Sequence, residues 1–288
     1  MPNGEPIVYR IMLGARLRRL RESTGITRES AGYQIRASDS KISRMELGRV
    51  GFKERDVADL LTLYGVVTDT DRAPILALAR EANRPGWWRA FADVVPSWSE
   101  PYLGLETAAA LIRTYHLHLI PDLLQTEEYA RAVIRQTSSR GVLSDEVVDR
   151  MVAMRTTRQR LLRSPDAPKL WAVVDEAALS PRIGSTAVLR AQLAYLAELA
   201  TASNIIIQVL PAAYGGHVSA GGTFTILRFT EPEVPDVVHI EHQSGTVHLD
   251  RPEDVDRYEE LMNRIGVDSV TPDRTPAYLA RLGSRLGV

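Results

Sequence analysis

A short segment near the N-terminus is rich in the side chains that proteins use to contact DNA. Short polar and cationic residues alternate with apolar ones between residues 38 and 49, and Arg28 and Lys53 flank this segment. On a helix that lies in the major groove, such side chains reach base edges and phosphates. We therefore predict a set of DNA-contacting residues comprising Arg28, Ser38, Asp39, Ser40, Lys41, Ser43, Arg44, Arg49 and Lys53.

Two groups of titratable residues in the C-terminal half have side chains that are used in active sites. His239 and Glu241 alternate onto one face of an expected strand, and such pairs can bind zinc, but their spacing matches no zinc motif. Asp175 and Glu176 follow another expected strand, where carboxylates can act as general acids or bases. They suit equally the cap and first turn of a short helix, which is the role that we expect. We predict that the chain is not an enzyme and needs no metal or cofactor.

Three of the four tryptophans, Trp87, Trp88 and Trp98, lie close together in the sequence. They fit anchoring of a linker and its first helix onto a core, which we favour, or stacking against a ligand. The glycines around His217 indicate hairpin turns, since they lack the strand–glycine–helix order of a phosphate-binding loop. The residues that we consider for contact with a ligand or a partner protein are Trp87, Trp88, Trp98, His217 and Glu241.

The candidate DNA-contacting residues require two short helices joined by a tight turn. Apolar spacing predicts a first helix that ends at Gly25, and Gly48 is expected to stop the third. Thr27 and Ser38 are residue types that cap helix N-termini. The helices expected after the first cover residues 28–35, 39–47, 54–64 and 71–83, with Arg36 and Ala37 in the turn between the second and third.

The remainder of the chain mixes helical and strand-like patterns. Asn83 to Gly86 is a natural break, so we predict domains at residues 1–83 and 84–288. Expected helices cover residues 105–116, 126–136, 144–162, 185–202 and 252–265, and expected strands cover 170–174, 205–210, 223–229, 237–240 and 246–249. The predicted fold is an N-terminal all-α five-helix bundle followed by an α+β or α/β domain with one sheet.

The charge is unevenly distributed, with a basic N-terminal segment and an acidic remainder. Between Arg10 and Arg55 there are twelve Arg/Lys and five Asp/Glu residues, a balance of 12 − 5 = +7, whereas the whole chain carries −1. Such an asymmetry is typical of a discrete phosphate-contacting module. The chain has no cysteine, and we see neither an apolar signal core nor a membrane-spanning run, so we expect a cytoplasmic, nucleoid-associated protein.

The N-terminal motif resembles a known family of DNA-binding domains. The residues Ser40, Lys41, Ile42, Ser43, Arg44, Met45, Glu46, Gly48 and Arg49 match the end of the pattern of the XRE (Cro/C1-type) helix-turn-helix family. Two positions depart from it. Arg28 stands where the family often has glutamine, and Arg36 stands where it often has glycine, which tolerates positive φ more readily than arginine.

The C-terminal half is similar to actinobacterial XRE regulators of the WhiJ kind, which carry a domain of unknown function. The similarity rests on Ile120-Pro121, Leu123 to Ala130, Arg155, Arg158-Gln159, Asp175 to Leu179 and Val238 to Glu241, although Asp122 replaces a usual glycine. It implies a transcriptional regulator, in some cases with a small protein partner encoded nearby.

Several functional hypotheses follow. We expect a homodimer that binds a pseudo-palindromic operator on double-stranded DNA, with a second domain that senses a small-molecule effector or docks a partner. The alternative is an antitoxin-like protein that sequesters a small partner protein and regulates its own operon. A DNA-targeted enzyme is a third hypothesis, which the sequence leaves without a catalytic motif.

Overall fold

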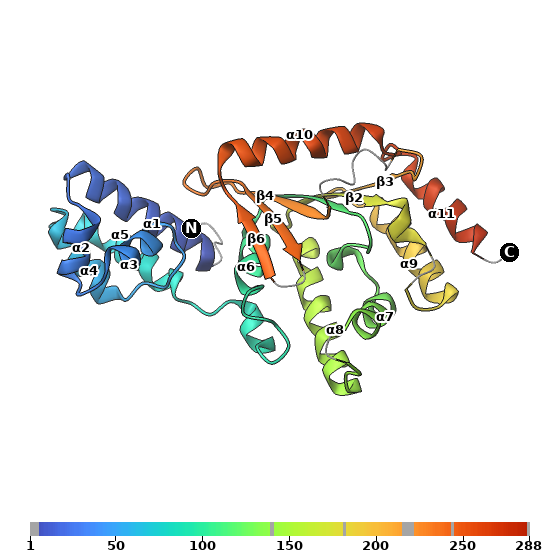
Figure 1. Cartoon of the computed structure of the whole chain (residues 1–288), viewed down its shortest axis with the longest axis horizontal. Coiled ribbons are helices and arrows are strands. Elements are labelled where there is room, and N and C mark those ends of the chain that lie inside the picture. Colours follow the sequence, from blue (N-terminus) through green and yellow to red (C-terminus); the bar gives the residue numbers. More distant parts are fainter. Residues whose placement is uncertain (1–5, 139–140, 181–182, 215–221, 243–244, 287–288) are drawn as a thin grey trace. The chain divides into compact units, whose positions relative to one another are not determined.

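A computed structural model describes residues 6–138, 141–180, 183–214, 222–242 and 245–286 (Figure 1). Contacts group the chain into two compact units. The first consists of Met1–Ala90, Glu100–Ala108 and Thr230–Pro235, and the second of Phe91–Ser99, Ala109–Phe229 and Asp236–Val288. The division into domains at residues 83 and 84 stays a prediction. No helix in the described ranges is both long and apolar enough to cross a membrane.

The first unit contains the predicted five-helix bundle. Its helices are α1 (Pro6–Ser23), α2 (Arg28–Gln34), α3 (Asp39–Glu46), α4 (Glu54–Leu63) and α5 (Asp69–Ala82), and α6 (Glu100–Ala108) also belongs to this unit. Leu13 and Leu17 of α1, Ile42 and Met45 of α3, and Leu61 of α4 are almost fully buried in one apolar core. Burial of this shared core stabilises the bundle, in which α2, α3 and α4 are too short to be stable alone in water.

The ends of the N-terminal helices are set by the capping residues that the sequence indicates. The Thr27 hydroxyl accepts a hydrogen bond from the Ser30 amide at 3.1 Å, and the Ser38 hydroxyl accepts one from the Lys41 amide at 3.2 Å. Gly25 and Gly48 have positive φ and follow the ends of α1 and α3. The predicted starts and stops around the turn are therefore confirmed.

The second unit is built on a single mixed six-stranded sheet. Its strands are β1 (Leu111–His116), β2 (Lys169–Asp175), β3 (Ile205–Leu210), β4 (Phe224–Arg228), β5 (Val237–His242) and β6 (Gly245–Leu249). Their order in the sheet is β3-β2-β1-β4-β5-β6, with β1, β2 and β3 parallel and the other neighbouring pairs antiparallel. The prediction of one sheet with helices around it is confirmed.

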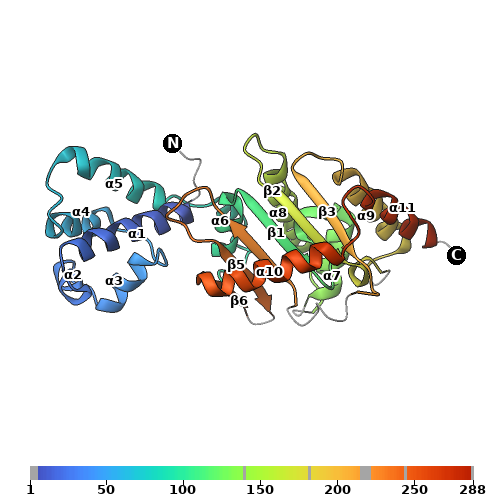
Figure 2. The same ribbon diagram turned by 90° about the horizontal axis from the view of Figure 1, so that it is seen from above.

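Helices cover both faces of this sheet (Figure 1). They are α7 (Glu127–Thr137), α8 (Asp145–Gln159), α9 (Thr186–Leu199), α10 (Pro252–Asp268) and α11 (Thr275–Arg285). Figure 2 shows α10 crossing the strands on one face, where Met262 and Ile265 pack against Tyr115, Phe224 and Val238. Figure 1 shows α7 and α8 on the opposite side of the sheet from α10.

One expected helix is wrong in its second half. The segment at residues 105–116 was expected to be a single helix, but α6 ends at Ala108 and Leu111–His116 form β1. The strand is central, paired with β2 on one side and β4 on the other, and four consecutive residues are buried. Burial on both faces removes the alternation of polar and apolar residues by which a strand is usually recognised.

Candidate nucleic-acid interface

The turn between α2 and α3 is tight because a glycine allows close approach. Ala31 and Gly32 of α2 are buried, and a Cβ atom on Gly32 would lie 2.6 Å from the Ala37 carbonyl oxygen. Only a residue without a side chain fits there. Arg36, in the turn, has φ of +54° and is the one non-glycine residue with positive φ in the described ranges. The sequence comparison that drew attention to Arg36 therefore identified a strained position.

The outer face of α3 carries short polar and cationic side chains. Asp39, Ser40 and Arg44 are exposed, while Ile42 and Met45 are buried in the core. The Arg44 Nε lies 3.4 Å from the Ser40 carbonyl oxygen, which is a long contact that leaves the guanidinium at the surface. The amphipathic spacing of α3 thus presents one polar face to solvent.

Arg28 connects α2 to this face. Its guanidinium lies 3.3 Å from the Asp39 carboxylate and donates a hydrogen bond to the Ser43 hydroxyl at 3.3 Å. All three side chains were predicted as DNA contacts, and the structure brings them together. The arginine offsets the negative charge of Asp39, which would otherwise repel phosphate.

Lys41, which was also predicted to contact DNA, has an ion-pair partner within the helical unit. Its ammonium group forms an ion pair of 2.9 Å with Asp56 of α4 and is only partly exposed. Lys41 precedes Met45 by one helical turn, so its side chain lies on the flank of α3 that faces α4. It is therefore a tether between two helices in this structure. Arg49 and Lys53, the remaining predicted cations, are exposed beyond the end of α3.

An ion pair between α1 and α3 fixes the position of α3. Arg21 and Glu46 form a bidentate contact of 2.5 and 3.0 Å, and Arg21 also donates to the Ile26 carbonyl oxygen at 3.0 Å. The two side chains are 12% and 7% exposed. The hydrogen bond to Glu46 raises the pKa of Arg21 above its ordinary value. Glu46, one of the residues of the family pattern, therefore has a structural role in this unit.

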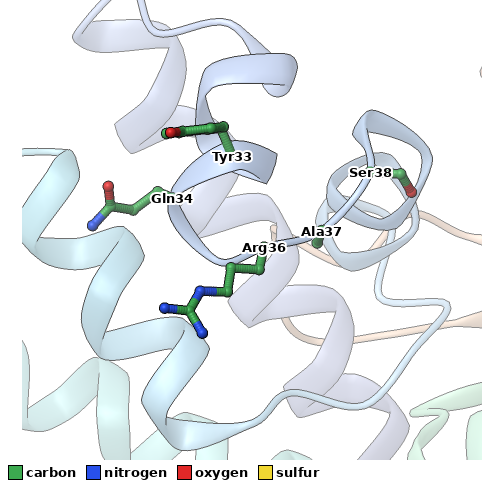
Figure 3. A pocket seen from close by; sticks show the side chains of 5 residues that line it. All are labelled: Tyr33, Gln34, Arg36, Ala37 and Ser38. Atoms are coloured by element: carbon green, nitrogen blue, oxygen red, sulfur yellow. The ribbon is translucent and has the colours of Figure 1, made fainter.

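Three exposed residues lie beside the predicted set but were not predicted to contact DNA or a ligand. Tyr33, Gln34 and Arg36 extend from the end of α2 and from the turn, and with Ala37 and Ser38 they line a surface hollow (Figure 3). Tyr33 is 87% exposed, which is unusual for an aromatic side chain. The signal available in the sequence was an aromatic residue in α2 at a position outside the apolar stripe.

The tryptophans that were considered for ligand or partner contact are mostly structural. The Trp87 indole donates to the Thr107 hydroxyl at 3.1 Å, and the Trp88 indole donates to Glu100 at 3.3 Å. Both contacts join the residues that follow α5 to α6 within the first unit. Trp98 belongs to the second unit and is 41% exposed. His217 lies outside the described residues.

The acidic and histidine candidates of the second unit are engaged in local contacts. Asp175 accepts a hydrogen bond from the Ala177 amide at 2.8 Å, as expected of a cap, and Glu176 accepts one from the Ala212 amide at 2.9 Å. A ring nitrogen of His239 lies 3.1 Å from one of His248. No cluster of three or more potential metal ligands occurs within the described ranges.

Two known protein families match parts of this chain. The family described as Domain of unknown function (DUF5753) matches residues 99–281, more than half of the chain. The chain belongs to this family. A second family, described as Helix-turn-helix domain, matches residues 12–75 of this DUF5753 protein, which include α2, the turn and α3. No match was found among the curated proteins or among the solved structures. A helix-turn-helix domain is the architecture of a DNA-binding regulator.

Proposed function

We propose that this DUF5753 protein is a sequence-specific transcriptional regulator that reads DNA with α3. The observation that carries the proposal is the exposed polar face of α3, where Ser40 and Arg44 are accessible and Arg28 offsets the charge of Asp39. A helix of this kind fits the major groove, where arginine recognises guanine and short polar side chains reach other base edges. The surrounding exposed cations, Arg36, Arg49 and Lys53, suit contacts to phosphate.

The resemblances in sequence support a finer assignment. We propose that the helix-turn-helix is of the XRE type and that the chain is a WhiJ-like regulator, acting as a homodimer on a pseudo-palindromic operator. The second unit would control DNA binding by sensing a small molecule or by docking a partner protein. We propose further that the protein is not an enzyme, since Asp175, Glu176 and His239 are engaged in structural hydrogen bonds.

The proposal is tested by selecting tight-binding duplexes from a random DNA pool with the full-length protein. Fluorescence anisotropy then compares the selected duplex with a scrambled one at several salt concentrations. We expect the selected duplex to bind at least about a hundredfold more tightly, with affinity that falls steeply as salt rises. Equal affinity for both duplexes would contradict sequence-specific recognition.

A further inference from the structure

Leu47 is the only apolar residue among the exposed residues between positions 38 and 49. The structure describes this whole segment, and its other exposed members are Ser38, Asp39, Ser40, Arg44 and Arg49. Leu47 is 43% exposed, whereas the apolar residues of α3 that face the core, Ile42 and Met45, are each 1% exposed. The apolar surface of Leu47 is therefore not used by the core of its own unit and is available to a binding partner.

Leu47 follows directly after α3 and lies in the middle of the face that we propose to contact DNA. Its backbone is close to helical, with φ of −89° and ψ of 3°, and its amide donates to the Ser43 carbonyl oxygen at 3.1 Å. Seven residues of an α-helix make two turns with a drift of about 20°, so Leu47 projects in nearly the same direction as Ser40. Arg44 lies about one turn before Leu47 on the same side. The face therefore carries Ser40, Arg44 and Leu47 in one row.

The chain on either side of Leu47 is fixed by its backbone. Gly48 has φ of +65°, and a Cβ atom placed on it would lie 2.8 Å from both the nitrogen and the Cα of Ile11 in α1. Because a side chain there would clash, the backbone after Leu47 can lie directly against α1. The Arg49 amide donates to the Arg44 carbonyl oxygen at 2.8 Å and closes the end of the helix. Leu47 is thus preorganised, and a contact through it does not require the chain to become ordered first.

The chemistry of leucine restricts what this side chain can recognise on DNA. It forms no hydrogen bond, and it gains nothing by approaching a charged phosphate. In the major groove the base edges present hydrogen-bond donors and acceptors, with one apolar exception, which is the C5 methyl group of thymine. Contact between two apolar groups removes both from water and so favours binding. An apolar side chain on this face is therefore matched to thymine.

We propose that Leu47 is a specificity-determining residue that recognises the C5 methyl group of a thymine in the bound DNA sequence. This inference rests on the proposed recognition of DNA by α3. Ser40 and Arg44 supply hydrogen bonds to neighbouring base edges, and Leu47 adds discrimination through an apolar contact. Cytosine in place of the thymine has no methyl group and carries a hydrogen-bond donor, so it leaves Leu47 without its partner.

The test replaces thymine by deoxyuridine, which lacks only the C5 methyl group and keeps every hydrogen-bonding atom of the base edge. The full-length protein is titrated by anisotropy with the duplex selected from the random pool. It is then titrated with a set of duplexes that each carry one deoxyuridine in place of a thymine. We expect the wild type to bind about fourfold more weakly when the thymine that Leu47 contacts is replaced, which is the equivalent of one buried methyl group.

Leu47→Ala should abolish this dependence on the methyl group. The variant is expected to fold, because the side chain that it shortens is exposed. It should bind the thymine duplex and its deoxyuridine counterpart equally, about fourfold more weakly than the wild type binds the thymine duplex. Leu47→Met keeps an apolar side chain of similar volume and should retain the fourfold difference. Ser40→Ala, on the same face, should retain it too, because Leu47 stays in place.

Two results would overturn the proposal. One is a wild-type affinity that no deoxyuridine replacement lowers. The other is an effect of the methyl group that is as large in Leu47→Ala as in the wild type, which would assign the methyl contact to another residue. Neither result affects the proposed function, which is judged by the preference of the wild type for the selected duplex over a scrambled one. Absence of that preference would refute sequence-specific recognition, and the role of Leu47 with it.

Discussion

Replacement of Arg36 by glycine should stabilise the helical unit while it weakens DNA binding. Arg36 has φ of +54° in the turn between α2 and α3. A non-glycine residue in this conformation costs about 1–2 kcal/mol. Glycine removes that cost but gains about 0.4–1 kcal/mol of additional freedom in the unfolded chain. The expected net stabilisation is therefore roughly 0.5–1 kcal/mol.

The same change removes an exposed guanidinium next to the candidate DNA-contacting helix. If Arg36 contacts a phosphate, the plot of log affinity against log salt should become shallower by about 0.9, the value for one lost phosphate contact. Arg36→Ala is the matched control, because alanine also removes the cation but keeps the strained conformation. Both variants should lose DNA affinity, and only Arg36→Gly should gain stability.

The change in stability of the helical unit is measured by native-state hydrogen exchange of its core amides, such as those of Ile42 and Leu61. This measurement reports on the first unit even if the second unfolds separately. Exchange in Arg36→Gly should slow by about two- to fivefold, which corresponds to the net free energy above. Faster exchange in Arg36→Gly than in Arg36→Ala would refute the assignment of strain to this residue.

Three further outcomes follow from the contacts described above. Glu46→Gln should destabilise the helical unit by about 3 kcal/mol, because it leaves a largely buried arginine without its counter-charge; denaturation at the wild-type midpoint would show that the pair is dispensable. Asp56→Asn should release Lys41 and tighten DNA binding by roughly fivefold, since a pair of unit charges at contact distance in water interacts by about 1 kcal/mol. Asp59→Asn is the control, because it makes the same charge change on α4 without releasing that lysine. Equal effects of the two variants on DNA affinity, measured by anisotropy, would argue against a tether. Burial lowers the pKa of His239 from 6.5 to about 3. The unfolded chain therefore takes up the proton first, and the free energy of unfolding falls as the pH drops below about 6.5, by roughly 2 kcal/mol at pH 5. Denaturant unfolding of His239→Gln should show a smaller loss of stability at acid pH, and an unchanged loss would exclude this histidine as its source.

The helix-turn-helix was predictable because its signals are local. The hydroxyls of Thr27 and Ser38 each accept a hydrogen bond from the amide three residues later, and Gly25 and Gly48 end helices by their own conformation. Even the strain at Arg36 could be anticipated, since a turn that usually holds glycine imposes positive φ on whatever residue replaces it.

Features that depend on distant partners were not predictable in the same way. The ion pair of Lys41 could not be predicted from local pattern, because its partner Asp56 lies on a separate helix. β1 was read as part of a helix because its pairing with β2 and β4 buries both of its faces. Tertiary pairing overrides local pattern most strongly at such central strands.

The contacts of Asp122 with Arg155 and Arg158 show why a group of side chains from separate segments is harder to predict than a helix. Asp122 comes from the segment after β1, and both arginines come from α8. Asp122, Arg155 and Arg158 were visible in the sequence only as parts of separate motifs. No spacing along the chain indicates that they meet, because the strand order that brings them together is set by the whole sheet.

The central claim, that α3 reads base pairs, is tested most directly by a base-substitution scan. The affinities of the wild type and of Arg44→Ala are measured for the selected duplex and for every single base-pair substitution in it. If Arg44 contacts a base edge, the variant should lose discrimination at one or two positions by about 1–3 kcal/mol and retain it elsewhere. Weakening by the same factor at every position would assign Arg44 to the phosphate backbone and contradict base readout by this residue of α3.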